Sequence, residues 1–163
     1  MNRDQAERPG MYVWWGDAEA CAVLGAEMGL ALGPLLYVGQ AGATKWPSGR
    51  RSNATLARRI VRQHIRGNAR SSTFRRTISA LLLDRLSLIV AAGGRLDRPS
   101  NARVSAWIAE HLTVGIAPFD DRDSLGRIER LVLDEIDPPL NLGQCVPSEA
   151  RSRLTQVRSR LRH

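Results

Sequence analysis

A chain of 163 residues with a net charge of +8 can bury one hydrophobic core and is short for more than one domain. Its two cysteines, Cys21 and Cys145, form neither a CxxC pair nor a zinc-binding spacing, which argues against a disulfide scaffold and favours a reducing compartment. No signal peptide and no membrane-spanning apolar run is visible, so we predict a cytoplasmic protein that does not bind membranes.

The predicted elements alternate between strands and helices along the chain. After a polar extension at 1–9, the run MYVWWG predicts a strand, and its alternation places Tyr12 and Trp14 on one face. Helices are expected at 17–31, 55–66, 72–90, 101–111 and 119–136, and further strands at 35–39 and 112–118. The segment 40–54 is expected to be a loop, and the basic tail at 147–163 is expected to be a short helix. This order predicts an α/β mixture with a small sheet.

The basic residues are distributed unevenly along the chain. Between Glu27 and Asp84 there is no acidic residue, but there are ten basic ones. We expect nucleic-acid contacts from Lys45, Arg50, Arg51, Arg58, Arg62, Arg66, Arg70, Arg75 and Arg76. A surface with one sign of charge favours a polyanion, although a basic face that keeps the protein soluble is the alternative.

Four sequence features resemble the GIY-YIG nuclease family. GMY at 10–12 resembles the first half of the signature and YVG at 37–39 the second, and the family's order continues across 10–142. TLARRIVRQHIRGN resembles the family's arginine helix, and IERLVLDEIDPPLN resembles its closing glutamate and asparagine segment. The resemblance implies a nuclease domain at 10–146 of α/β (α+β) class, with a three-stranded mixed or antiparallel sheet flanked by helices. It also implies a metal-dependent endonuclease that cuts DNA with Mg²⁺, for which Mn²⁺ can substitute.

Two departures from the family pattern concern the site. Gln40 stands where many relatives have a lysine, and Lys45 or an arginine of the loop 40–54 is the candidate replacement for that cation. His64 follows Arg59 by five residues, which turn an α-helix through about 140°, so the two side chains are expected to diverge. These departures motivate an alternative function, a catalytically inactive nucleic-acid-binding protein that keeps the fold.

Hydrolysis of a phosphodiester needs a water, a base for its proton and positive charge around the phosphoryl oxygens. The resemblance implies that Glu129 is the main ligand of one divalent metal ion, and Mg²⁺ suits its hard oxygen atoms. The alternative role of Glu129 is a surface carboxylate paired with Arg127 or Arg130. Asp134 and Glu135 are nearby rivals for the metal.

Three further residues complete the implied catalytic set around these groups. Arg59 is the implied phosphate-stabilising arginine. His64 lines up with Leu56 and Ile60, so it either reaches the site from the helix end or is a hydrogen-bonded histidine at the edge of the core. Asn141, just after two prolines, resembles the family's terminal asparagine, which implies a structural or positioning role.

Tyr12 and Tyr37 are the only tyrosines of the chain, and both fall in the signature. A phenol has a pKa of about 10, so it needs nearby arginines or a metal-bound water to act as a base at neutral pH. The resemblance implies Tyr37 as the general base and Tyr12 as its orienting partner, and two structural strand tyrosines are the alternative. Gly10 and Gly39 are expected as structural glycines, with Gly39 allowing a close backbone approach.

The sequence leaves the substrate and the oligomeric state open, beyond the expectation that DNA is the partner. No zinc module or helix-turn-helix accompanies the motifs, so target choice is expected from the loop 40–54, the segment 84–111 or the basic tail. Trp46 in that loop either stacks on bases or packs on the surface. The helix start at Ser72-Thr73 is a candidate site for a backbone phosphate.

Overall fold

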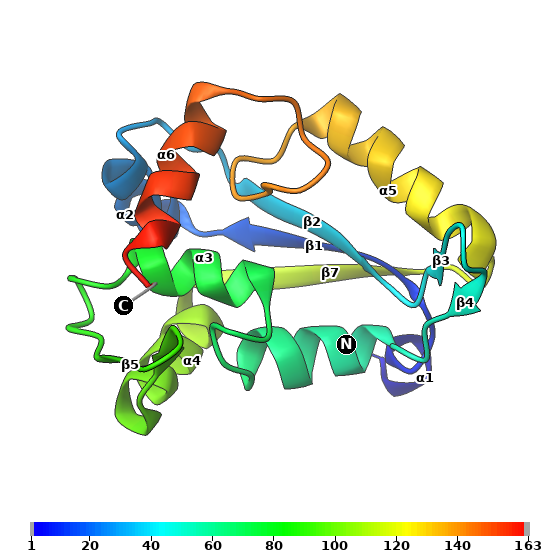
Figure 1. Cartoon of the computed structure of the whole chain (residues 1–163), viewed down its shortest axis with the longest axis horizontal. Helices are drawn as coiled ribbons and strands as arrows, with labels where there is room; N and C mark the ends of the chain where they lie inside the picture. The colour runs from blue at the N-terminus through cyan, green and yellow to red at the C-terminus, as the bar shows by residue number, and fades with distance from the viewer. Residues whose placement is uncertain (1, 162–163) are drawn as a thin grey trace.

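A three-stranded antiparallel sheet forms the centre of the molecule, with strand order β2-β1-β7 (Figure 1). The computed structural model describes residues 2–161. The strands span Gly10–Gly16 (β1), Leu35–Ala41 (β2) and Leu112–Pro118 (β7). The three expected strands are confirmed, and so is an α+β fold with an antiparallel sheet flanked by helices.

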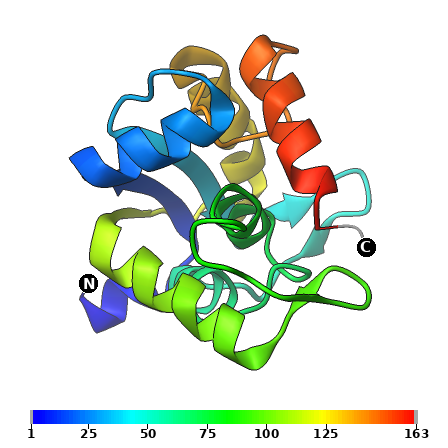
Figure 2. The same cartoon turned by 90° about the vertical axis from the view of Figure 1, so that its left-hand side faces the viewer.

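Helices surround this sheet on both faces. They span Arg3–Ala6 (α1), Ala18–Met28 (α2), Arg58–Ile65 (η1), Thr73–Leu81 (α3), Arg98–His111 (α4), Arg122–Ile136 (α5) and Glu149–Ser159 (α6). In Figure 1 the sheet lies between α5 on one side and α3 on the other. Figure 2 shows α3 nearly end-on in the centre, with α2 and α6 above it and α4 below. Within residues 2–161, no helix is both long and apolar enough to cross a membrane.

The two faces of β1 meet different layers. Tyr12 and Trp14 are 3% and 1% exposed, as their alternation predicts, and Trp14 stacks on Phe74 of α3 with 4.8 Å between ring centroids. On the opposite face α5 packs on β2, where Val38 and Leu125 are fully buried. The signature residue Tyr12 therefore points into the main core.

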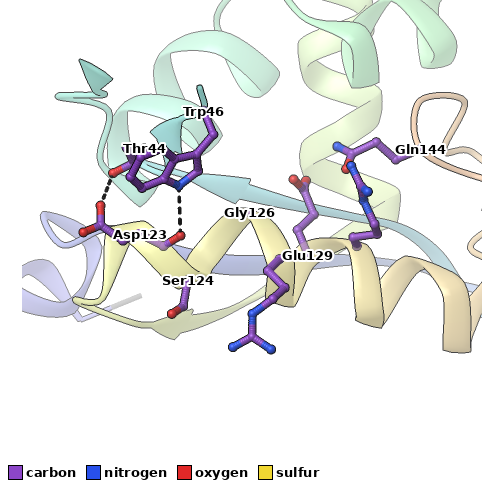
Figure 3. A pocket seen from close by; sticks show the side chains of 9 residues that line it. Thr44, Trp46, Asp123, Ser124, Gly126, Glu129 and Gln144 are labelled. Carbon is purple, nitrogen blue, oxygen red and sulfur yellow. Dashed lines mark hydrogen bonds between the residues drawn. The ribbon is translucent and has the colours of Figure 1, made fainter. Parts of the chain in front are cut away.

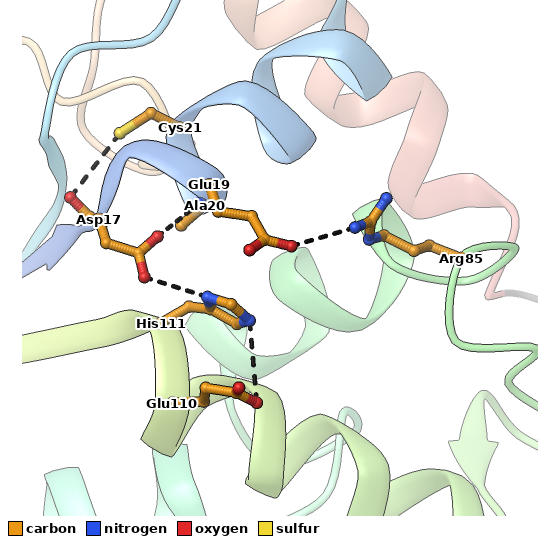
Figure 4. Close-up of polar contacts among 8 residues, drawn as sticks. Asp17, Glu19, Ala20, Cys21, Arg85, Glu110 and His111 are labelled. Atoms are coloured by element: carbon orange, nitrogen blue, oxygen red, sulfur yellow. Dashed lines mark hydrogen bonds and ion pairs between the residues drawn. The ribbon is translucent and has the colours of Figure 1, made fainter.

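Asp17 begins α2 and also ties it to the end of α4. One carboxylate oxygen accepts a hydrogen bond from the Ala20 backbone N–H at 2.7 Å, which caps the helix. The other oxygen lies 3.0 Å from His111 Nδ1 (Figure 4). Gly29 ends the helix with a left-handed φ of 62°. These two caps stabilise a helix whose interior contains one weakening glycine, Gly25.

The arginine helix η1, Arg58–Ile65, is a π-helix rather than an α-helix. Its hydrogen bonds join residues five apart, as in the 2.9 Å bond from the Arg66 N–H to the Val61 carbonyl. A π-helix turns residues five apart through a smaller angle than an α-helix does. The expected α-helix, on which the divergence of Arg59 and His64 was based, is therefore wrong, and the charge of Arg59 acts on His64.

The helix expected at 72–90 is shorter in the structure. It ends at Leu81, and Ser87 adopts a positive φ of 46° before the hairpin of β5 (Val90–Ala91) and β6 (Arg95–Leu96). The leucines after position 81 continue the helical pattern, but Leu82 is buried from a turn and Leu88 from an irregular segment after it. Burial alone therefore explains their apolar character.

Two other segments also differ from the prediction. The helix expected at 101–111 starts earlier, at Arg98, because Asp97 caps it and Pro99 fits its first turn, where no N–H donor is needed. The loop expected at 40–54 contains a hairpin, formed by strands β3 (Thr44–Lys45) and β4 (Arg50–Arg51).

Helix α6 contributes to the same core as the sheet. Leu154 is fully buried, and the helix packs on α2 and α3. Arg151 forms an ion pair with Asp137, which ends α5. The division of the chain between residues 146 and 147 stays a prediction.

Candidate active site

Tyr12, His64 and Ser72 form a hydrogen-bonded chain inside the core. The Tyr12 hydroxyl lies 2.7 Å from His64 Nε2, and His64 Nδ1 lies 2.7 Å from the Ser72 hydroxyl oxygen. All three side chains are buried. His64 is therefore a hydrogen-bonded histidine of the core edge, and the same hydrogen bonds connect it to the signature tyrosine.

Tyr37 lies beside Tyr12 on the neighbouring strand. Their ring centroids are 6.4 Å apart, and their planes differ by 23°. Tyr12 is paired with Gly39, where any side chain would overlap the Tyr12 hydroxyl. A side chain at Gly10 would likewise overlap the Ala117 carbonyl. Tyr37 is only partly buried and is thus the more accessible of the two phenols.

Burial shifts the pKa of these groups toward their neutral forms. Burial raises the pKa of Tyr12 well above its usual value, and raises the pKa of Tyr37 to about 12. Burial lowers the pKa of His64 from 6.5 to about 3, and the charge of Arg59 adds to this effect. A neutral imidazole can either accept a hydrogen bond from the Tyr12 hydroxyl or donate one to it, depending on its tautomer.

Arg59 connects the tyrosines with the glutamate. Its positive charge lowers the pKa of both tyrosines, of His64 and of Glu129. Its Nη1 donates to Gln63 Oε1 at 2.7 Å, whereas its Nε is buried and has no hydrogen-bond partner among residues 2–161. An unpaired buried donor costs about 1–3 kcal/mol, so Arg59 carries a donor that the described protein does not satisfy.

Glu129 projects from α5 on the side of Gln144 (Figure 3). Burial raises the pKa of Glu129, while the Gln144 side chain, the charge of Arg59 and the Gln40 backbone N–H oppose this rise. Among the described residues, Glu129 forms no ion pair with its helix neighbours Arg127 and Arg130. The ion pair on which the alternative role of Glu129, that of a surface carboxylate, depended is therefore not formed.

A groove of about 640 Å³ opens along α5 at Glu129. Its wall also includes Trp46 of the β3–β4 hairpin, Gly126 of α5 and Gln144 of the following loop (Figure 3). In the part of the chain that the structure describes, no three His, Cys, Asp or Glu side chains lie close enough to hold a metal ion by themselves. A metal at Glu129 would therefore take most of its ligands from water and substrate.

Most of the predicted nucleic-acid contacts lie on the surface. The exposed side chains are Lys45, Arg50, Arg51, Arg58, Arg62, Arg66 and Arg70. Arg76 is partly buried, and its guanidinium donates to the Ala69 and Arg70 carbonyls, each at 3.1 Å.

Arg75 contradicts the prediction of nucleic-acid contact. It is fully buried, and its Nη1 donates to the carbonyls of His64 and Ile65 at 3.0 and 2.6 Å. Burial lowers the pKa of Arg75 to about 10, so the group stays charged at neutral pH. The Ser72 hydroxyl is likewise occupied, by His64 and by the Arg75 backbone N–H. Arg75 therefore stabilises the end of the π-helix, which a charge pattern alone cannot distinguish from surface binding.

A sequence model of the GIY-YIG catalytic domain matches residues 10–160 of this chain. The chain belongs to the GIY-YIG family. Members of this family are generally nucleases. No curated protein matches the chain significantly, and no solved structure does either. The matched range includes helix α6, so the family domain reaches beyond residue 142.

In this GIY-YIG domain Asn141 holds the backbone of β2. Its Oδ1 accepts from the Val38 N–H at 3.0 Å, and its Nδ2 donates to the Val38 carbonyl at 2.8 Å. Val38 is next to Tyr37, so these bonds fix the backbone at the signature tyrosine. Because Asn141 is buried, the geometry favours a positioning role over contact with substrate.

Two residues near the GIY-YIG site were not predicted from the sequence. Gln63 lies four residues after Arg59 on a helix, a spacing that brings side chains together and could have indicated the contact. Gln144 stands in a polar loop with a positive φ of 65°, and no motif marks it. Only the return of the chain past α5 brings it to Glu129.

The residues at Glu129 fit a hard divalent cation. Burial raises the pKa of Glu129, so an added positive charge at its carboxylate would favour the ionised form. Mg²⁺ is typically bound by one or two carboxylates, retained waters and substrate phosphates, which suits one glutamate at an open groove.

Proposed function

We propose that this GIY-YIG protein is a metal-dependent endonuclease that hydrolyses phosphodiester bonds of DNA. The observation that carries the proposal is the position of Arg59. Its charge acts on both tyrosines and on Glu129, and the protein leaves its buried Nε without a partner among residues 2–161. The guanidinium would stabilise the negative charge that develops on a phosphoryl group between the tyrosines and Glu129.

In this mechanism Tyr37 first releases its own proton to solvent and then, as the phenolate, takes the proton of the attacking water. Burial raises the pKa of Tyr37 to about 12, so the positive charges of Arg59 and a bound metal would have to favour that form. Tyr37 is more accessible than Tyr12, and the charge of Arg59 favours its phenolate. Tyr12 orients Tyr37, and the hydrogen bond to the neutral ring of His64, which Ser72 holds, fixes the Tyr12 hydroxyl.

Glu129 would hold Mg²⁺, or Mn²⁺ in its place, with the amide of Gln144 beside the carboxylate. The ion would supply positive charge at the phosphate and lower the pKa of a bound water. The protein contributes the carboxylate, the open groove for substrate and the second cation, Arg59.

The exposed basic residues support DNA as the substrate. The arginine helix presents Arg58, Arg62 and Arg66 to solvent, and the β3–β4 hairpin presents Lys45 and others. Cations of this kind neutralise backbone phosphates, so binding should weaken steeply as salt is raised.

A DNA-binding protein without catalysis is the second candidate, and Gln40 favours it. The Gln40 side chain accepts a hydrogen bond from the Ala43 N–H at 3.1 Å, so it serves the turn after β2 and brings no cation. In that case the protein would bind DNA with the same dependence on salt and leave it intact with every metal.

Cleavage assays with matched variants test the proposal. With Mg²⁺ or Mn²⁺ we expect the protein to nick or cut plasmid DNA, and EDTA should stop the reaction. Glu129→Gln should cleave at least about 100-fold more slowly, because it removes the metal's carboxylate. Glu135→Gln, an exposed position of the same helix, should cleave like the wild type.

Three outcomes would contradict this function. They are cleavage that resists EDTA, cleavage by Glu129→Gln at the wild-type rate, and salt-sensitive DNA binding with no cleavage under any metal. The last outcome would establish the second candidate instead.

A further inference from the structure

Trp46 is an exposed aromatic side chain on a basic hairpin. It follows β3 directly and is 66% exposed. Lys45, Arg50 and Arg51 of the same hairpin are also exposed. Arg51 pairs with Asp123 at 3.7 Å, at an exposed position where such a pair is weak. A large indole left in water beside these cations suits a ligand that offers both an apolar face and negative charge, as a nucleotide does.

Helix α5 holds this hairpin in place. Thr44 Oγ1 donates to Asp123 Oδ1 at 2.5 Å, and Trp46 Nε1 donates to the Asp123 carbonyl at 3.4 Å (Figure 3). The Arg122 guanidinium donates to the carbonyls of Gly42 and Ser52, at 2.9 and 2.7 Å, where the chain enters and leaves the hairpin. The indole is therefore anchored by its N–H edge, and its orientation relative to α5 is set before any ligand arrives.

Trp46 and Glu129 border the same groove with an open floor between them. Gly126 lies between the two along α5 (Figure 3). A Cβ added at Gly126 would have Ala43 Cβ as its nearest neighbour in the described chain, 4.0 Å away. The six steps from Asp123 to Glu129 rise about 9 Å along the helix, which is room for two or three nucleotides of a strand at about 3.4 Å each when stacked.

We propose that Trp46 is a stacking platform for an unpaired base, next to the phosphodiester that passes Glu129. This inference rests on the proposed function, because it assumes that the DNA backbone lies at Glu129. Bases of an intact duplex have both faces covered by their neighbours, so they cannot offer a free face to the indole. The site therefore prefers DNA that is unpaired beside the cut, and Lys45, Arg50 and Arg51 hold the backbone of that strand.

Metal-free binding measurements test this inference without requiring cleavage. A single-stranded oligonucleotide in EDTA should quench the tryptophan fluorescence of the wild type. Trp14 and Trp107 are buried, so Trp46 and the 37%-exposed Trp15 are the candidates for the signal. Trp46→Phe should lose the quenching, whereas Trp15→Phe should keep it. Loss of the signal in Trp15→Phe alone would overturn the inference.

Affinity provides the second readout. Trp46→Ala should bind the single strand about 5- to 150-fold more weakly, while its affinity for a fully paired duplex changes little. Gly126→Leu should produce the same selective loss by filling the groove floor, and Gly126→Ala should not. Equal losses for duplex and single strand would overturn the inference, because they would indicate a general backbone contact.

Cleavage then separates this inference from the function on which it rests. The wild type should cut DNA with unpaired bases faster than the matched duplex, and Trp46→Ala should remove that preference. Equal cleavage rates for DNA with unpaired bases and for the matched duplex would overturn the stacking role of Trp46 but would leave the proposed nuclease activity standing. Quenching through Trp46 in a protein that never cleaves would overturn the nuclease and leave the stacking role intact.

Discussion

The tyrosine–histidine side of the site is closed inside the core, whereas the glutamate side opens onto a groove. The buried half consists of Tyr12, His64 and Ser72, joined by two hydrogen bonds of 2.7 Å. The open half consists of Trp46, Gly126, Glu129 and Gln144, which share the wall of the groove.

The contrast indicates which changes should affect folding and which should affect chemistry. Polar atoms of the buried half already have partners, so removing one leaves an unpaired group in the core. Groups of the open half have space for a ligand, so removing one should weaken binding or catalysis. Arg59 lies between the halves, because its charge acts on both while its Nε has no partner among residues 2–161.

The largest effect is expected from Arg59→Ala. Single-turnover cleavage should slow by about 1,000-fold or more, since an arginine at a transferring phosphoryl group contributes this much. The stability of this variant in urea should change little, because the substitution removes only one side-chain hydrogen bond, the bond to Gln63. Arg58→Ala, an exposed neighbour, is the control. It should weaken DNA binding but cleave nearly normally when the protein saturates the DNA. A similar rate for both variants would remove Arg59 from the chemistry.

Asn141→Ala should affect stability most. It leaves the N–H and carbonyl of Val38 unpaired in the interior, so the free energy of unfolding should fall by about 2–4 kcal/mol in urea titrations. Asn53→Ala, at an exposed position, serves as the control. A fall in the free energy of unfolding as small as that of the control would show that the two Asn141–Val38 hydrogen bonds are dispensable.

Gly39→Ala should disturb the buried half through the Tyr12 phenol. The added methyl group overlaps the Tyr12 hydroxyl, so unfolding should become easier by about 1–3 kcal/mol, and cleavage should slow as well. Gly33→Ala is the matched change, because no atom of the described chain lies within 4 Å of its added Cβ. Equal stability of the two variants would mean that Tyr12 can move aside.

The smallest effect concerns pH and His64. The pKa of His64 is about 3 in the folded protein and 6.5 as its unperturbed value, so only the unfolded chain binds the proton between these values. The stabilisation is complete above pH 6.5 and is lost as the pH falls, by at most about 1.4 kcal/mol per pH unit. Urea unfolding between about pH 7 and pH 5 should show this slope in the wild type and a flatter one in His64→Gln. Identical slopes would exclude a neutral buried His64.

The sequence predicted the strands because their apolar and aromatic residues alternate with a period of two. The same alternation placed Tyr12 and Trp14 inside, as their burial confirms. The family signature also indicated which distant residues to compare, and Tyr12, Arg59 and Glu129 do influence one another. Local pattern and motif order were sufficient for this part of the site.

Other features depend on contacts that no local pattern carries. The π-helix that contains Arg59 and His64 could not be distinguished from an α-helix by the spacing of its apolar residues. Arg75 has the same sequence pattern as the exposed arginines near it, but its guanidinium is buried and donates hydrogen bonds to carbonyls at the end of that helix. Gln144 reaches Glu129 only because the chain folds back after α5.

The most direct test is whether the two halves serve one reaction. Single-turnover cleavage would be measured for Tyr37→Phe, Glu129→Gln and the double variant, with DNA binding measured in parallel. Groups that act in the same step are not additive, so the double variant should be about as slow as the slower single variant while still binding DNA. Rates that multiply, or wild-type cleavage by Tyr37→Phe, would contradict a single active site shared by the buried and open halves.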